Sequence, residues 1–229
     1  MGHKKRGYKR DETLVRDYTL FAIACEGGKR EPEYFRLFQS MSPKIKVDII
    51  GSTVPDAEMK RKHETKSSPK WVLDRAIKYI ETEGLSDEDQ LWFVMDIDQW
   101  ETAQLREIYD YCQDKPNWNL VLSNPCFEVW LYFHKKAAIV KSASITCNDF
   151  KNEISTFEKG GYRPHTFIKE IENANRHAKK ADSDKNHFLP KYKETKVYQL
   201  GEALVSTIGK SAFDDFLANK LPALIRVRK

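Results

Sequence analysis

Residues 91–98 have the sequence LWFVMDID, in which an apolar run of strand length stops abruptly at two acids. A second run, TLFAIACEGG at residues 19–28, stops in the same way at Glu26 and two glycines. Proteins that alternate strands and helices present their ligand-binding groups at the carboxyl ends of buried parallel strands. These two stretches therefore predict an α/β fold with a carboxylate-rich site at one edge of its sheet.

The rest of the first 135 residues also alternates between strand and helix patterns. The expected strands are 20–25, 46–51, 91–95 and 119–122, and the expected helices are 31–41, 69–83, 101–114 and 125–135, with a charged loop at 52–68. Such alternation implies a mostly parallel sheet flanked by helices on both faces. The C-terminal third carries apolar stripes at helical spacing, and we expect it to pack on the sheet or on a partner.

Three regions follow from this pattern: a basic N-terminal arm at 1–17, an α/β core at 18–136 and a mainly helical region at 137–229. The first ten residues carry five bases and no acid, and residues 159–196 carry ten bases against five acids. Two basic stretches that flank an acidic centre suit a polyanionic partner such as nucleic acid. An ordinary solvated surface explains either stretch equally well when each is taken alone.

The composition excludes several classes of protein. No apolar run approaches the roughly 20 residues that span a bilayer, and the N-terminus lacks the apolar stretch of a signal peptide. We therefore expect a soluble, cytoplasmic protein with no membrane partner. The four cysteines show neither the spacing of a zinc site nor that of a disulfide framework, so we expect reduced thiols in the core.

Asp96 and Asp98 form a pair at the end of the second apolar run. If the strand continues through both, their side chains face the same way, about 6.6 Å apart along the chain. Two ionised carboxylates at that separation repel by roughly 2–3 kcal/mol at an effective dielectric constant near 20, a cost that a cation between them offsets. Mg²⁺ or Mn²⁺ suits such a pair. Alternatively, Asp98 caps the next helix and Glu101 completes the capping box.

Glu26 ends the first apolar run and is expected at the same sheet edge as Asp96. The glycines that follow turn the backbone sharply beside its carboxylate. Residues 27–30, Gly-Gly-Lys-Arg, precede an expected helix and could hold a phosphate on their backbone amides. Their spacing matches neither a Walker loop nor a dinucleotide fingerprint.

Glu128 is the fourth candidate acid, in the sequence SNPCFEVWL at residues 123–131. Asn124 is expected as the N-cap of the next helix and Pro125 as its first-turn residue. Glu128 then lies at the positive end of the helix dipole, at the same sheet edge as the other acids. The alternative is a surface glutamate that only complements the dipole.

Together these elements resemble the RloB-like proteins, which carry a Toprim-like domain. The resemblance covers residues 18–205 and rests on CEGGK (25–29), EPEYF (31–35), DID (96–98), SNPCFEVWL (123–131) and TKVYQL (195–200). It implies a Toprim-like core at 18–136. In that superfamily a strand-end glutamate and a D-x-D pair bind Mg²⁺, which implies these roles for Glu26, Asp96 and Asp98. Glu128 has no counterpart in the minimal Toprim signature.

The resemblance implies a metal-dependent nuclease, linked to anti-phage defence and working with an ABC- or AAA-type ATPase as overcoming-lysogenization-defect nucleases do. The sequence holds no Walker motif, so the ATPase is expected on a separate chain. Glu26, Asp96 and Asp98 would hold one or two Mg²⁺ or Mn²⁺ ions, with Glu128 as a further ligand. Basic residues would position the nucleic-acid backbone, namely Lys29, Arg30, Lys179 and Lys180. The alternatives are a non-catalytic nucleic-acid-binding or sensor subunit and a nucleotidyl-transfer enzyme.

Overall fold

The computed structural model describes residues 16–51 and 68–227. Its centre is a four-stranded sheet in which every neighbouring pair of strands is parallel. The strands are β1 (Thr19–Cys25), β2 (Ile45–Ile50), β3 (Gln90–Asp96) and β4 (Trp118–Ser123), in the order β2-β1-β3-β4. The α/β fold with a mostly parallel sheet is confirmed. Most of the predicted basic arm and of the charged loop at 52–68 lies outside the described residues.

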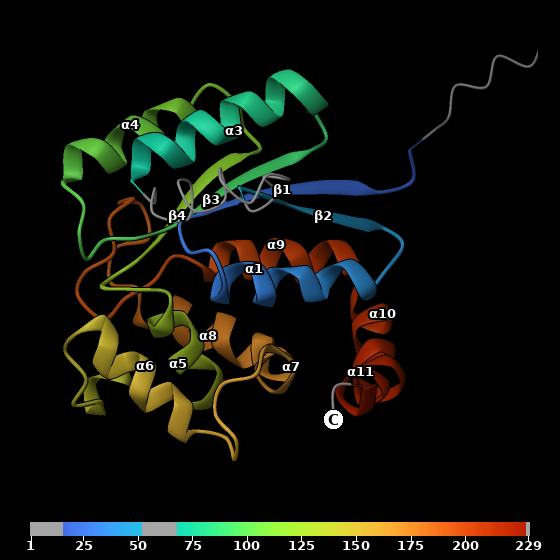
Figure 1. Ribbon diagram of the computed structural model, residues 1–229, viewed down its shortest axis with the longest axis vertical. Coiled ribbons are helices and arrows are strands. Elements are labelled where there is room, and N and C mark those ends of the chain that lie inside the picture. Colours follow the sequence, from blue (N-terminus) through green and yellow to red (C-terminus); the bar gives the residue numbers. More distant parts are fainter. Residues whose placement is uncertain (1–15, 52–67, 228–229) are drawn as a thin grey trace, which may run out of the picture.

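Helices cover both faces of the sheet (Figure 1). One face carries α3 (Pro69–Glu83) and α4 (Thr102–Cys112), and the other carries α1 (Arg30–Phe35) and α9 (Tyr198–Ile208). The period of two in β1 explains this arrangement, because successive side chains of a strand point to opposite faces. Phe21 and Ile23 join the core on the α1 and α9 side, whereas Ala22 and Ala24 join the core under α3 and α4.

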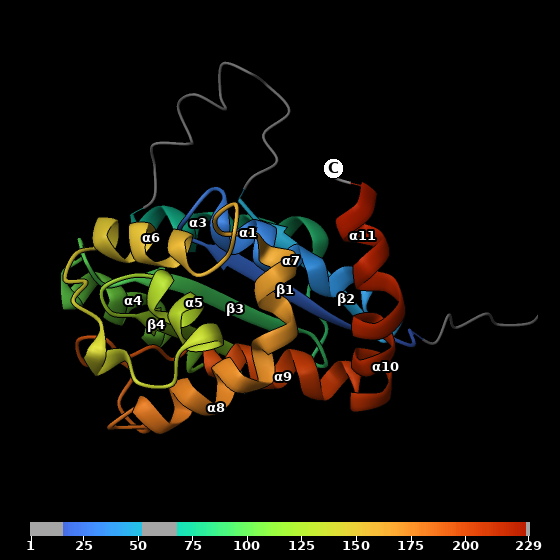
Figure 2. The ribbon, with the colours of Figure 1, turned by 90° about the horizontal axis from the view of Figure 1, so that it is seen from below.

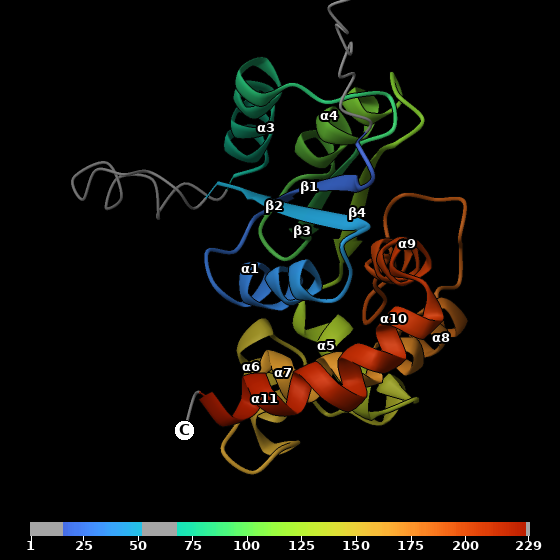
Figure 3. The same ribbon diagram turned by 90° about the vertical axis from the view of Figure 1, so that its right-hand side faces the viewer.

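The C-terminal third is helical, as expected. Its α-helices are α6 (Cys147–Thr156), α7 (Pro164–Phe167), α8 (Ile171–Ala181), α9, α10 (Lys210–Asp215) and α11 (Leu221–Val227). Figures 2 and 3 show α10 and α11 in succession along one side of the molecule, following α9. Apolar residues of this region share one buried core with β1, β2 and α1. The helical region therefore packs on the sheet.

Two expected helices differ from those observed. The helix expected at 31–41 is α1 followed by a 3-10 helix (Arg36–Ser40). The helix expected at 125–135 is α5 (Glu128–Lys135), which begins three residues later than predicted. The backbone before α5 is bonded elsewhere: the Asn124 carbonyl accepts from the backbone nitrogen of Lys193, and the Pro125 carbonyl accepts from those of Ile97 and Asp98. Those carbonyls are consequently not part of a helical ladder.

No helix within residues 16–51 and 68–227 is both long enough and apolar enough to cross a bilayer.

Candidate active site

The sheet has a topological switch point between β1 and β3. The chain leaves β1 toward β2 on one side, and it leaves β3 toward β4 on the other side. Ligands of open α/β sheets bind outside the carboxyl ends of the strands at such a point, where the two connections diverge. Glu26 directly follows β1, and Asp96 is the last residue of β3. Both acids therefore lie at the position where the fold opens a crevice.

Glu26 is fixed in this crevice by two hydrogen bonds. Its Oε2 accepts from the backbone nitrogen of Asp96 at 2.9 Å, and its Oε1 accepts from the indole nitrogen of Trp100 at 2.9 Å. The pKa of Glu26 is raised to about 7. Burial is the main cause, and the charges of Asp98 and Glu31 add to it, whereas the two donors lower the pKa. A carboxyl group with such a pKa exchanges its proton near neutral pH.

Asp96 is surrounded by the other acids. Burial holds the pKa of Asp96 well above its usual range, and charges on four neighbouring carboxylates add to the effect, those of Glu31, Glu26, Glu128 and Asp98. Like charges around a half-buried carboxylate disfavour its ionised form. The five residues, called the acid cluster below, thus form one electrostatic unit built from β1, α1, β3 and α5 and the turns beside them.

Glu31 is a member of the acid cluster to which sequence reasoning assigned no role. It lies in the first turn of α1, is buried, and folds back over Gly27. A Cβ atom on Gly27 would lie 2.2 Å from Oε2 of Glu31, so only glycine leaves room for the carboxylate. Burial and then the charge of Glu128 raise the pKa of Glu31 to about 6. The sequence signal was a glutamate shortly after a strand-end Glu-Gly-Gly, within the EPEYF motif.

Asp98 does not continue the strand. β3 ends at Asp96, so Asp98 lies in an exposed turn, and the expected alternation of side chains does not extend to it. Its Oδ2 accepts a hydrogen bond from the thiol of Cys147, with Sγ and Oδ2 3.0 Å apart. The interpretation of Asp98 as a helix cap is wrong, because Glu101 is the N-cap of α4 and forms a capping box with Gln104.

Glu128 is the first residue of α5 and is buried, so it is not a surface glutamate. Its carboxylate forms an ion pair with the guanidinium of Arg30, and the Glu128 side chain is only 4% exposed. The expected N-cap, Asn124, is wrong: Phe127 precedes the first turn, and the Asn124 amide donates instead to the Pro190 carbonyl at 3.1 Å. Glu128 therefore faces the acid cluster with a cation already bound to it.

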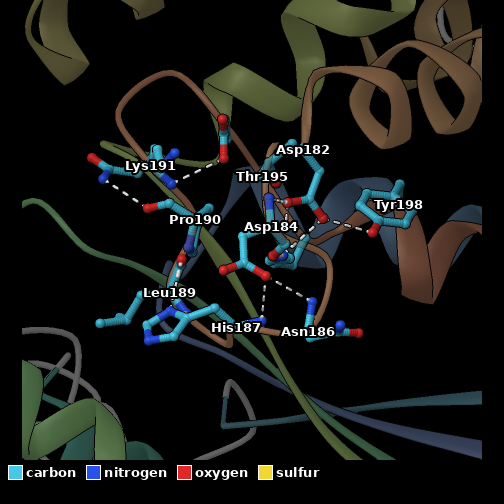
Figure 4. Close-up of polar contacts among 12 residues, drawn as sticks. Asp182, Asp184, Asn186, His187, Leu189, Pro190, Lys191, Thr195 and Tyr198 are labelled. Carbon is cyan, nitrogen blue, oxygen red and sulfur yellow. Dashed lines mark hydrogen bonds and ion pairs between the residues drawn. The ribbon is translucent and has the colours of Figure 1, made fainter.

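The connection between α8 and α9, residues 182–197, holds the chain around Asn124 in place. Thr195 pairs with Ser123 in an isolated antiparallel bridge, and their hydroxyl oxygens lie 2.8 Å apart. Figure 4 shows Asp182, Thr195 and Tyr198 gathered at one end of this connection. There the ammonium group of Lys196 bonds both carboxylate oxygens of Asp182, at 2.7 and 2.8 Å, and both side chains are almost fully buried. This ion pair belongs to the connection whose backbone bonds Asn124, shortly before α5 and Glu128.

The four predicted nucleic-acid-binding bases line two different cavities. Lys29 and Arg30 line one beside α1 and α7, and Lys179 and Lys180 line another between α8 and α9. Lys179 forms an ion pair with Glu202, with Nζ 2.9 Å from Oε1. The two pairs of bases therefore do not line one common cavity, although each remains available to a polyanion.

The chemistry of the acid cluster fits a hard divalent cation, because such ions take carboxylate oxygens as ligands. Within the described part of the chain, no three acid, cysteine or histidine side chains are arranged to hold a metal ion as they stand. Glu26 in particular directs both oxygens to hydrogen-bond donors. Metal binding would therefore use the second lone pair of each Glu26 oxygen, together with rotations of other acid side chains in the cluster, and the donor set itself is suitable.

Comparison with known proteins identifies the family. A family model described as RloB-like protein matches residues 21–204, which is most of the chain. The chain belongs to the RloB-like family. Searches of curated proteins and of solved structures each found no match. The RloB-like region begins within β1 and includes the other three strands, the whole acid cluster and the connection between α8 and α9, and it ends within α9. The family resemblance expected from the sequence is confirmed.

Proposed function

We propose that this RloB-like protein is a metal-dependent nuclease that cleaves phosphodiester bonds in DNA or RNA. The observation that carries the proposal is the contact between Glu26 and Asp96 at the switch point of the sheet, with three further carboxylates acting on Asp96. A crevice lined by several carboxylates is costly unless protons or a cation occupy it. Phosphodiester chemistry uses divalent cations held by such groups.

The electrostatics favour a cation over protons at neutral pH. The pKa of Glu26 is about 7 and that of Glu31 about 6, so the metal-free acid cluster keeps part of its protons near pH 7. A divalent cation releases those protons because its ligands must be ionised. Its binding therefore replaces one form of charge compensation by another.

Within this proposal Glu26, Asp96 and Asp98 hold Mg²⁺ or Mn²⁺, and Glu31 and Glu128 complete the negative field around it. The ion, when bound, would lower the pKa of a water molecule and neutralise charge that develops on the scissile phosphate. If Asp96 and Asp98 hold the ion without Glu26, Glu26 can instead act as the general base, since its pKa in the metal-free site is about 7. Trp100 and the Asp96 backbone orient its carboxylate.

The bases beside the crevice supply the substrate contacts. Arg30 bonds Glu128 on one side and lines a cavity with Lys29 on the other, so it joins the acid cluster to a basic wall. Contacts of lysine and arginine with phosphates fix the register of a nucleic acid without reading its sequence. Family resemblance supports two further parts of the proposal, a Toprim-like core and an anti-phage role with a separate ATPase.

The test is cleavage of DNA and tRNA by the purified protein in Mg²⁺ or Mn²⁺, with and without the separate ABC- or AAA-type ATPase that the proposal invokes. Asp96→Asn should lower the rate by at least about 100-fold, because it removes a central carboxylate while keeping its shape. Asp87→Asn is the matched control, since Asp87 precedes β3 and its side chain is 96% exposed. Cleavage that survives in the folded Asp96→Asn protein would contradict the mechanism.

A second candidate is a non-catalytic nucleic-acid-binding subunit, and one observation favours it. Glu26 is already saturated by Asp96 and Trp100, as in a site that serves only to hold two loops together. This candidate predicts salt-sensitive binding with no product in any metal. It also predicts that Asp96→Asn leaves the biological activity unchanged. Incorporation of nucleotides in vitro would instead indicate nucleotidyl transfer.

A further inference from the structure

A second feature of the molecule is a cavity of about 680 Å³ beside α1. Side chains from α1, α6, α7 and α11 and from the loop before α7 line it. Its volume lies within the usual range of small-ligand sites, about 300–1,000 Å³. The cavity is therefore large enough for a ligand of nucleotide size.

The charged residues of the cavity favour an anion. Lys29, Arg30 and Arg163 supply three cations, and Glu33 supplies one carboxylate. Lys29 and Arg163 are exposed, and neither forms an ion pair with any residue in the described ranges 16–51 and 68–227. Cations without protein partners around a concave surface attract phosphate groups.

The cavity also has apolar lining residues, and one of them carries an unusual polar atom. The apolar lining consists of Tyr162, Pro164, Leu224 and Ile225. The hydroxyl oxygen of Tyr162 is buried and has no hydrogen-bond partner among the described residues. A buried hydroxyl without a partner is costly, so native proteins rarely keep one. A ligand in the cavity can supply the missing partner.

Arg30 connects this cavity to the acid cluster. Its guanidinium forms the ion pair with Glu128 and lies 5.6 Å from the centre of the Tyr162 ring. The charges of Arg30, Glu31, Glu33 and Glu128 all act on the Tyr162 hydroxyl. A ligand in the cavity therefore lies close to Glu128, a member of the acid cluster.

We propose that this cavity binds one nucleotide of a single nucleic-acid strand, next to the nucleotide whose phosphate lies at the acid cluster. Lys29 and Arg163 hold its phosphate, and the base packs against Tyr162 and Leu224. The Tyr162 hydroxyl donates to an oxygen of the nucleotide. This inference deepens the proposed nuclease function and rests on it. A basic wall and an aromatic face together are the usual means of holding a single strand.

The test measures binding in EDTA, so that it does not depend on cleavage. The probes are fluorescein-labelled oligothymidylate and oligouridylate of about 12 nucleotides, a length within the usual site size of single-strand binders. The variants are Arg163→Gln and Tyr162→Phe. The control is Lys78→Gln, which removes an exposed cation of α3, on the other face of the sheet from α1.

Arg163→Gln should weaken binding of the preferred strand by about tenfold and lower the slope of log K against log salt by about 0.7, the value for one phosphate contact. Tyr162→Phe should weaken binding by about three- to tenfold at an unchanged slope. Photo-crosslinking of the same oligouridylate with 4-thiouridine substituted in it should label Tyr162 or Leu224. Lys78→Gln should bind within about twofold of the wild type, because substitutions at distant sites act independently.

Three results would overturn the inference: no binding of either strand by the wild-type protein, binding by Arg163→Gln and Tyr162→Phe as tight as that of the wild type, or tighter binding of free thymidine or uridine monophosphate than of the strands. The nuclease proposal fails separately. If the protein binds the strands as described but never cleaves them, the nuclease proposal is contradicted and the proposed nucleotide-binding cavity stands. If Arg163→Gln and Tyr162→Phe cleave as well as the wild type does, the proposed cavity is contradicted and the nuclease proposal stands.

Discussion

The carboxylate of Glu26 accepts a hydrogen bond from the backbone nitrogen of Asp96 at 2.9 Å, although 70 residues separate the two in the chain. Parallel pairing of β1 with β3 creates this contact, because it places Cys25 opposite Val94 and so brings the two strand ends together. The acids meet because the topology brings their strand ends to one edge, which is why the fold itself positions the site.

Gly27 and Gly28 offer a matched pair of substitutions. Gly27→Ala should push the Glu31 carboxylate out of the acid cluster, because the new Cβ would lie 2.2 Å from Oε2, whereas Gly28 has no atom within 4 Å of its added Cβ. We expect Gly27→Ala to lower the rate of cleavage by about tenfold, because changes to groups around a metal site lower activity by about 10–100-fold. The stability of the protein should change little. Equal cleavage rates in Gly27→Ala and Gly28→Ala would show that Glu31 has no role in cleavage.

Trp100 is expected to matter through Glu26. Trp100→Phe removes the indole donor to Oε1 of Glu26, and that donor helps to keep the carboxylate ionised. Loss of a partner that orients a metal ligand weakens metal binding by about 10–100-fold. Calorimetric titration with Mn²⁺ at constant pH measures this effect. Trp71→Phe, which alters a partly exposed indole on α3, serves as the control and should bind as the wild type does.

The stability of the metal-free protein should fall as the pH rises. The pKa of Glu26 is raised from its ordinary value of 4.5 to about 7, so its stabilising contribution is complete below pH 4.5 and is lost as the pH passes through 7. Between pH 5 and pH 8 the loss should be on the order of 2 kcal/mol. Urea unfolding of the wild type and of Glu26→Gln measures the difference in pH dependence. Mg²⁺ should reduce this dependence in the wild type alone.

Lys196 is expected to be essential for stability. Lys196→Met leaves Asp182 as a buried carboxylate without its cation, and such a change costs about 3–5 kcal/mol. Urea denaturation should show this loss, and the additional change Asp182→Asn should restore part of it. Lys185→Met, at an exposed position of the same connection, should change the free energy of unfolding by less than about 0.5 kcal/mol. Similar stabilities for the two single variants would contradict this interpretation.

The sheet could be predicted from the sequence because each strand is an apolar run that ends at polar residues. β1 and β3 read as buried strands, and the Pro69–Glu83 helix matches its expected bounds. These features depend on local sequence, where apolar periodicity is a strong signal. The shared position of Glu26 and Asp96 at one edge of the sheet could be predicted from the expected parallel order of the strands.

The details of the site could not be predicted, because they depend on contacts distant in sequence. α5 starts at Glu128 because the backbone around Asn124 bonds Lys193 and Glu194, about 70 residues further along the chain. Asp98 left the strand direction because its backbone nitrogen bonds the Pro125 carbonyl. Glu31 joined the acid cluster by folding back over Gly27, a direction that no sequence period encodes.

The most direct measurement is anomalous diffraction from crystals of the protein soaked in Mn²⁺. The account predicts an anomalous peak between Glu26 and Asp96, with carboxylate oxygens at roughly 2.0–2.6 Å from it, and no such peak in Asp96→Asn crystals. Crystals that show no peak there, with Glu26 still bonded to the Asp96 nitrogen and to Trp100, would contradict the metal site and the nuclease with it.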